Sequence, residues 1–346
     1  MSDTLSSVSP RDARALAQID ALLLREGIRR DRHLDYICAL FDEDGQAVAT
    51  GSCFGNTLRC LAGSSERQGE GLLNRIVSHL MELQAQRGNT HVFLYTKVKS
   101  ARFFGDLGFY EIARAPGEAV FMENRRTGFA DYCRALAQTR REGVCGAVVM
   151  NANPFTLGHR YLVEQAARAC DAVHLFVLSE NIGPIPFAVR RDLVRRGVED
   201  LPNVICHDSG PYIISAATFP SYFLPDDDSA AAAHARLDLA VFGRIAEALG
   251  VTRRYVGQES ASHVTAIYNE TMAKSLPELG IECIVVPRLE LAGRVVSAST
   301  VRQAIHDGVE DTVQDMLPPA TAAYFASPEA EGVIRAIRAM SDARHH

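Results

Sequence analysis

The sequence has little lysine and no basic block. Lys97, Lys99 and Lys274 are the only lysines among 346 residues, and the formal net charge is -6. Binding to the phosphate backbone of nucleic acids depends on clustered Lys and Arg. The charge balance therefore argues against a general affinity for nucleic acid.

Long apolar runs and paired cysteines are also lacking. No segment reaches the roughly 20 apolar residues needed to span a bilayer, and the N-terminus has no signal-peptide pattern. The eight cysteines form no Cys-x-x-Cys pair, so the sequence indicates neither a zinc site nor a disulfide framework. We expect a cytoplasmic protein with reduced thiols, no membrane contact and no metal-ligand set of its own.

The chain does contain a strand that leads into an anion-binding helix start. Residues 146–159 read Gly-Ala-Val-Val-Met-Asn-Ala-Asn-Pro-Phe-Thr-Leu-Gly-His, an apolar strand followed by a turn and an amphipathic helix. Gly158 lets the backbone come close to an anion, and helix-start N–H groups direct partial positive charge at it. His159 can donate to a phosphate oxygen, and Thr156 can form a further hydrogen bond. This arrangement is typical of nucleotidyl transfer.

These residues resemble the signature of the nucleotidyltransferase superfamily, in which Phe-Asp-Pro-x-Thr-x-Gly-His follows the first strand of a Rossmann-like domain. Asn153 stands where that pattern has Asp, and it lies close enough in sequence to join either the α-phosphate or the acetate site. A second cluster, Val-Ser-Ala-Ser-Thr-Val-Arg at 296–302, resembles the superfamily's Ile-Ser-Ser-Thr-x-x-Arg motif. Helix capping alone would explain Ser297 and Ser299, but the resemblance assigns both, with Arg302, to the β- and γ-phosphates.

The fold class is predicted as α/β with two domains. A GNAT-like α+β domain is expected at 1–125, a linker helix at 126–143, and a Rossmann-like nucleotidyltransferase domain with a parallel sheet and C-terminal helices at 144–346. The GNAT resemblance rests on the glycines at 69 and 71 and on Leu-Gly-Phe at 107–109. Glu66 stands at the first position of the coenzyme A motif, where a carboxylate opposes a pyrophosphate. Structural glycines are therefore the favoured interpretation of this loop.

The order of these motifs, with Tyr-Ile-Ile-Ser-Ala-Ala-Thr-Phe-Pro-Ser-Tyr-Phe at 212–223 between them, resembles the citrate lyase ligase family. The resemblance implies an ATP- and Mg²⁺-dependent enzyme. It would acetylate the thiol of the phosphoribosyl-dephospho-coenzyme A group on the acyl carrier subunit of citrate lyase, through acetyl-adenylate, with release of AMP and diphosphate. Acetate and the carrier subunit are the expected partners. A small-molecule adenylyltransferase and an acetyltransferase are the alternatives, and docking of the carrier is the expected role of the N-terminal domain.

The candidate site residues follow from these motifs. The catalytic candidates are His159, Thr156 and Arg302. The candidates for ATP binding are Asn151, Asn153, Gly158, His159, Gly257, Glu259, Ser297, Ser299 and Arg302. The candidates for the acid-substrate pocket are Arg190, Tyr212, Ser215, Thr218 and Tyr222. A solvated helix face explains Arg190 equally well, and strand packing or turn formation explains the other four. His174 lies in an apolar strand and is interpreted as a hydrogen-bonded core residue.

Overall fold

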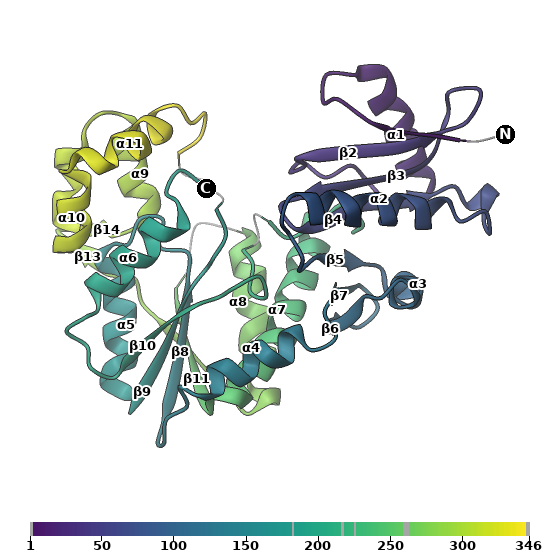
Figure 1. Cartoon of the computed structure of the whole chain (residues 1–346). Coiled ribbons are helices and arrows are strands. Elements are labelled where there is room, and N and C mark those ends of the chain that lie inside the picture. The colour runs from purple at the N-terminus through teal and green to yellow at the C-terminus, as the bar shows by residue number, and fades with distance from the viewer. Residues whose placement is uncertain (1–2, 182, 216–217, 225, 259–262, 344–346) are drawn as a thin grey trace. The chain divides into compact units, whose positions relative to one another are not determined.

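The computed structural model describes residues 3–343 except 182, 216, 217, 225 and 259–262 (Figure 1). The chain divides into two compact units, one formed by 1–131 with 220–240 and the other by 132–219 with 241–346. Two of the three boundaries fall within helices α4 (Gly128–Ala137) and α7 (Asp227–Leu249), and the third lies between Phe219 and Pro220. The segment 220–240 thus packs with the N-terminal unit, although it follows the first strands of the other unit in sequence.

The N-terminal unit is built on a seven-stranded sheet in the order β1-β2-β3-β4-β5-β7-β6. Its strands are β1 (Thr4–Ser7), β2 (Tyr36–Phe41), β3 (Ala47–Phe54), β4 (Thr57–Gly63), β5 (Phe93–Thr96), β6 (Tyr110–Ala115) and β7 (Ala119–Glu123). Its helices include α1 (Ala13–Arg25), α2 (Leu72–Gln86) and α3 (Ala101–Asp106). All of its strand pairs are antiparallel except β4–β5. The expected α+β architecture is confirmed.

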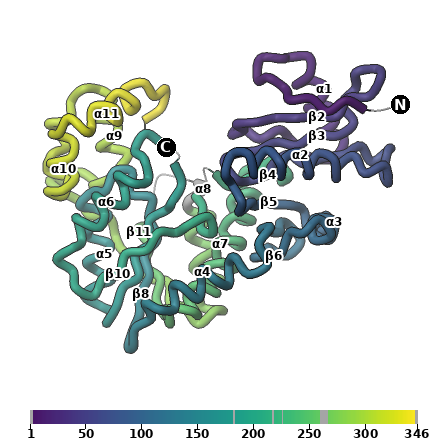
Figure 2. The backbone as a smooth tube through the Cα atoms, viewed as in Figure 1, coloured from purple at the N-terminus to yellow at the C-terminus, as the bar shows by residue number. Residues whose placement is uncertain are grey.

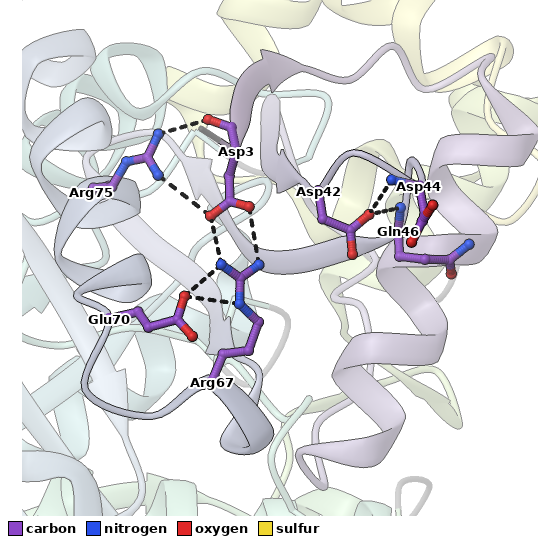
Figure 3. A network of polar contacts seen from close by, with 7 residues as sticks. All are labelled: Asp3, Asp42, Asp44, Gln46, Arg67, Glu70 and Arg75. Atoms are coloured by element: carbon purple, nitrogen blue, oxygen red, sulfur yellow. Dashed lines mark hydrogen bonds and ion pairs between the residues drawn. The ribbon is translucent and has the colours of Figure 1, made fainter. Parts of the chain in front are cut away.

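The turn between β2 and β3 shows how the local sequence fixes this hairpin (Figure 3). The carboxylate Oδ1 of Asp42 accepts the backbone N–H groups of Asp44 (3.1 Å) and Gln46 (2.8 Å). Gly45 adopts a φ of 74°, which residues with a Cβ rarely do. The Asp-Gly turn signal and the short polar side chain therefore determine where the chain reverses.

The loop before α2 is held by ion pairs within the chain (Figure 3). The Arg67 guanidinium donates to both carboxylate oxygens of Asp3, at 3.0 and 3.1 Å, and through Nε to Glu70 Oε2 at 2.9 Å. Gly69 and Gly71 have φ values of 95° and 70°. The loop's guanidinium is thus paired with side chains of the same unit, and the glycines serve the turn into α2.

The C-terminal unit contains a five-stranded parallel sheet in the order β10-β9-β8-β11-β12. The strands are β8 (Cys145–Met150), β9 (Ala172–Val177), β10 (Val204–Asp208), β11 (Val251–Gly257) and β12 (Glu282–Val286). The order reverses at β8, which lies between β9 and β11. In open parallel sheets, ligands bind at the carboxyl ends of the strands beside such a reversal. The expected Rossmann-like parallel sheet is confirmed.

Besides α7, which lies between β10 and β11 in sequence, helices connect the other strands of this sheet and follow its last strand. They are α5 (Leu157–Ala169), α6 (Phe187–Gly197), α8 (His263–Ser275), α9 (Ala298–His306), α10 (Pro319–Phe325) and α11 (Glu331–Arg338), with the short hairpin β13 (Glu290–Leu291) and β14 (Arg294–Val295). Figure 2 shows α9, α10 and α11 gathered at one end of this unit, where α9 and α11 share an apolar cluster around Val301, Met316 and Ile337. Within the described ranges, no helix has the length and apolar character needed to cross a bilayer.

The expected domain boundaries remain a proposal. The packing adds one feature that the sequence did not indicate, namely that 220–240 belongs with the N-terminal unit. Arg29 illustrates the contact, because its backbone N–H donates to the carbonyl of Tyr222 at 2.7 Å and its Nη2 donates to the carbonyl of Leu224 at 2.9 Å. Such contacts between residues distant in sequence leave no periodic signal.

Candidate functional site

A pocket of about 1180 Å³ lies at the carboxyl ends of β8, β11 and β12, and all of the residues that line it belong to the C-terminal unit. The loop after β8 contributes Asn151 and Asn153, and the end of β11 contributes Gly257 and Gln258. The starts of α5 and α9 also line it. Two helix N-termini therefore face one cavity, an arrangement that favours negatively charged ligands.

Thr156 is the N-cap of α5 and forms a reciprocal capping box with His159. The Thr156 hydroxyl accepts the backbone N–H of His159 at 3.4 Å, and His159 Nδ1 accepts the backbone N–H of Thr156 at 3.1 Å. A ring nitrogen that accepts an N–H bond carries no proton of its own. The neutral His159 ring therefore carries its proton on Nε2, where it can donate.

His159 stays neutral at physiological pH. Burial, together with the positive charges of Arg302 and Arg288, lowers the pKa of His159 to about 4. The group that faces the pocket is consequently a fixed neutral donor rather than a titrating cation. Such a donor suits a phosphate oxygen and needs no proton transfer.

Gly158 brings the starts of α5 and α9 together. A Cβ built on Gly158 would lie 2.8 Å from the carbonyl oxygen of Val296 and 3.5 Å from Thr156 Oγ1. Val296 directly precedes Ser297, the N-cap of α9. The absence of a side chain at Gly158 is therefore required for helix packing, in addition to any close approach to an anion.

The start of α9 presents three hydroxyl groups in one cluster. The Ser297 hydroxyl accepts the backbone N–H of Thr300 at 3.1 Å and lies 2.9 Å from Ser299 Oγ and 2.8 Å from Thr300 Oγ1. All three residues line the pocket. Capping and ligand contact are compatible here, because Ser297 provides the cap and Ser299 and Thr300 also line the pocket.

Arg302 lines the pocket but is also tied to the backbone. Its Nη1 donates to the carbonyl of Asn153 at 2.5 Å, and its Nε donates to the carbonyl of Ala343 at 2.8 Å. Burial lowers the pKa of Arg302 to about 10, so it remains charged at neutral pH. The guanidinium therefore joins α9 to the loop after β8, which places its charge near the strand ends.

Arg190 lies beneath the site and does not line the pocket. It is 0% exposed, and Nη1 donates to the carbonyl of Asn151 (2.6 Å), to Asn151 Oδ1 (2.9 Å) and to the carbonyl of Leu178 (3.0 Å). Its remaining donors reach the carbonyls of Ile185 and Glu180. Arg190 thus links the ends of β8 and β9 and fixes the position of Asn151. Because it does not line the pocket, Arg190 is not placed to contact a ligand bound there.

The other acid-pocket candidates fall in different places. Ser215 and Thr218 both bond the carboxylate of Glu180, through the Ser215 backbone N–H at 3.1 Å and through the Thr218 hydroxyl. Burial raises the pKa of Glu180. Tyr212 packs its ring 4.9 Å from that of Tyr132. None of these described residues is part of the pocket lining.

Tyr222 belongs to the N-terminal unit, whereas Tyr212 and Thr218 belong to the C-terminal unit. Its ring is buried, and the pKa of its hydroxyl is raised by that burial. The expected contact of Tyr222 with the acid substrate stays a prediction. Glu259, the expected adenosine contact after Gly257, lies outside the described residues.

Comparison with known proteins shows to which family the chain belongs. The family described as citrate lyase ligase C-terminal domain matches residues 145–325. A protein named citrate (pro-3S)-lyase ligase from Klebsiella pneumoniae is 41% identical over 284 residues, covering 80% of this chain and 83% of that protein. The chain belongs to the citrate lyase ligase family. The proteins of the same name from Haemophilus influenzae and Escherichia coli are 34% and 36% identical, covering 91% and 93% of this chain and 96% and 94% of their own lengths.

Solved structures with local likeness to this citrate lyase ligase family member include a putative acyl-CoA N-acyltransferase from Klebsiella pneumoniae and a putative nicotinate-nucleotide adenylyltransferase from Vibrio parahaemolyticus. The first is 22% identical with a TM-score of 0.30 and covers 35% of this chain and 95% of its own. The second is 16% identical with a TM-score of 0.37 and covers 56% of this chain and 96% of its own.

Two charged residues of this citrate lyase ligase family member were not predicted from the sequence. Arg288 lines the pocket after β12 and donates through Nε to the carbonyl of Gln258 at 2.8 Å. Glu180 follows β9 and anchors the segment that contains Ser215 and Thr218. Both stand just beyond the carboxyl end of a parallel strand, which is the signal that could have identified them.

Proposed function

We propose that this protein acetylates the thiol of the phosphoribosyl-dephospho-coenzyme A group on the acyl carrier subunit of citrate lyase, using ATP and acetate. The observation that carries the proposal is the meeting of two helix N-termini, the neutral His159 donor and Arg288 in one pocket. These groups fit a polyphosphate. The names of the relatives support the choice of citrate lyase as the protein acted on.

The reaction has two balanced steps. A carboxylate oxygen of acetate bonds to the α-phosphorus of ATP while the bond from that phosphorus to the bridging oxygen breaks, and diphosphate leaves with the electron pair. The thiol then loses its proton and attacks the acetyl carbon, and AMP leaves. The first step builds negative charge on the phosphates, which preorganised donors stabilise without a covalent bond to protein.

Different residues of the pocket would bind different parts of ATP. His159 Nε2 and the backbone N–H groups at the start of α5 would hold the α- and β-phosphates, and the start of α9 with Ser299 would hold the terminal phosphate. Gly257 and Gln258, at the end of β11, would receive the nucleoside. Mg²⁺, when bound with the triphosphate, would neutralise part of the phosphate charge. Among the described residues no group of three or more His, Cys, Asp or Glu is placed to hold a metal, so phosphate oxygens and water would be its main ligands.

The test is acetate-dependent exchange of labelled diphosphate into ATP. Wild-type protein should catalyse exchange only when acetate is present, and His159→Ala should reduce the rate by about 10²- to 10³-fold, as expected for loss of one transition-state donor. His33→Ala, an exposed histidine of the N-terminal unit, is the matched control and should keep the wild-type rate. Absence of exchange in folded protein that binds ATP would contradict the proposal and favour a small-molecule adenylyltransferase.

The carrier step needs its own measurement. Incubation of the protein with ATP, acetate and the carrier subunit bearing its thiol group should add one acetyl group to the carrier, detected by mass spectrometry. Acetyl-adenylate formation with no transfer to the carrier would leave the first step intact and contradict the choice of acceptor.

The N-terminal unit is proposed to dock the carrier rather than to act as an acetyltransferase. The pairing of Arg67 with Asp3 and Glu70, together with Glu66 in the same loop, gives a pyrophosphate no free guanidinium at this position (Figure 3). Titration calorimetry with acetyl-coenzyme A should show no binding to the full chain. Saturable binding that is lost in Gly69→Val would contradict the docking role.

The location of the protein is proposed to be the cytoplasm. All eight cysteines are free thiols, and five of them are buried. Free thiols are typical of a reducing compartment. Fractionation of cells that express the protein would test this placement.

A further inference from the structure

Asn153 has a buried side-chain amide that the protein leaves without hydrogen bonds. The residue is 2% exposed, and neither its Oδ1 nor its Nδ2 finds a partner within the described part of the chain. It also lines the pocket. A buried amide without partners costs free energy that an apolar residue of similar size would not. The amide is therefore placed to meet a polar ligand group.

The backbone around Asn153 holds this amide in position. Its carbonyl accepts Arg302 Nη1 at 2.5 Å, and the neighbouring Asn151 is fixed by Arg190. A Cβ built on Gly183 would lie 2.6 Å from Asn153 Nδ2, so the chain after β9 passes close to the amide. The side chain consequently has little freedom to turn toward another partner.

The position of Asn153 in the sheet separates it from the expected nucleoside end of the pocket. Gly183 follows β9, whereas Gly257 and Gln258 end β11, and β8 lies between these two strands. The helix starts that suit phosphates belong to α5 and α9. The acid substrate must approach the α-phosphate from the side opposite the leaving diphosphate. With the helix starts assigned to the phosphates and the β11 end assigned to the nucleoside, the β9 side of the pocket is left for the acid. That side carries the unpaired amide.

We propose that Asn153 recognises the carboxylate of the acid substrate, with its N–H₂ group donating to the carboxylate oxygen that does not attack. This proposal rests on the proposed function and specifies a residue for it. A neutral amide can donate to an anion, whereas a carboxylate at the same place would repel it.

The test compares the same chemical change at two ends of the pocket. Asn153→Asp should raise the KM for acetate in diphosphate exchange by at least tenfold and change the Kd for ATP by less than threefold. Gln258→Glu, the matched control on the β11 side, should raise the Kd for ATP and leave the KM for acetate within threefold. Asn153→Ala, which adds no charge, should also raise the KM for acetate and guards against misfolding of the Asp variant.

The outcomes separate this inference from the proposed function. If wild-type protein shows no acetate-dependent exchange, the proposed function fails. If the wild type is active and both Asn153 variants fold and keep the wild-type KM for acetate, only the assignment of Asn153 fails. A tenfold loss of ATP affinity in Asn153→Ala with an unchanged KM for acetate would overturn the inference and place the amide against a phosphate.

Discussion

Substitution of Gly158 by alanine tests whether the contact between two helix starts sets the geometry of the pocket. The added Cβ would lie 2.8 Å from the carbonyl oxygen of Val296, whereas ordinary contact begins at 3.4 Å. The starts of α5 and α9 must therefore separate by about 0.6 Å, the difference between these distances. The obstructing atom belongs to the backbone, so a rotamer change cannot relieve the overlap.

The expected effect on stability is small because two terms oppose each other. Alanine favours a helix over glycine by up to about 1 kcal/mol, and overpacking of this kind costs about 1–3 kcal/mol. The free energy of unfolding should fall by about 0–2 kcal/mol. The effect on activity should be larger, because a displacement approaching 1 Å among catalytic groups can cost about 10²-fold. We expect kcat/KM for diphosphate exchange to fall by about 10- to 100-fold.

Gly332→Ala provides a matched control. Gly332 is the second residue of α11, just as Gly158 is the second residue of α5, and a Cβ at Gly332 would meet no atom within 4 Å. Gly332→Ala should therefore keep full activity and gain stability in urea unfolding. If Gly158→Ala behaved in the same way, with wild-type exchange and raised stability, the reasoning from the Val296 contact would be refuted.

Two further predictions concern buried groups of the C-terminal unit. His174 and His207 share a hydrogen bond of 2.9 Å, and burial lowers the pKa of each to about 4. The unfolded chain therefore binds more protons between pH 6.5 and 4, and the free energy of unfolding should fall as the pH drops through this window, by at most about 3 kcal/mol per ring. Urea unfolding at pH 7.5, 6 and 4.5 measures this, and a slope that His207→Phe does not flatten would contradict it. Arg190→Lys keeps the charge but loses the planar fork that binds the carbonyls of Asn151 and Leu178, so it should cost about 1–3 kcal/mol of unfolding free energy and raise the KM for ATP. If the unfolding free energy and the KM for ATP both kept their wild-type values, these hydrogen bonds of Arg190 would not be needed for either.

Local patterns in the sequence determined the alternation of strands and helices and the two helix starts of the pocket. Thr156 caps α5 and Ser297 caps α9, as their side chains and positions predict, because a cap is a contact between residues three positions apart. The parallel sheet followed from apolar strands separated by amphipathic segments.

The tertiary structure alone decided where the long side chains point. Arg190 lies on a helix with three other arginines, yet of these four arginines only Arg190 is fully buried, where it bonds carbonyls at the ends of two strands. His174 was expected to be a fully hydrogen-bonded core residue, but only its Nδ1 is bonded, to His207 of β10, and its Nε2 has no partner among the described residues. Tyr222 packs in the N-terminal unit although it follows β10 in sequence. Each of these outcomes depends on contacts between residues that are far apart in sequence. Such contacts form only when the whole chain has folded, so no local pattern indicates them.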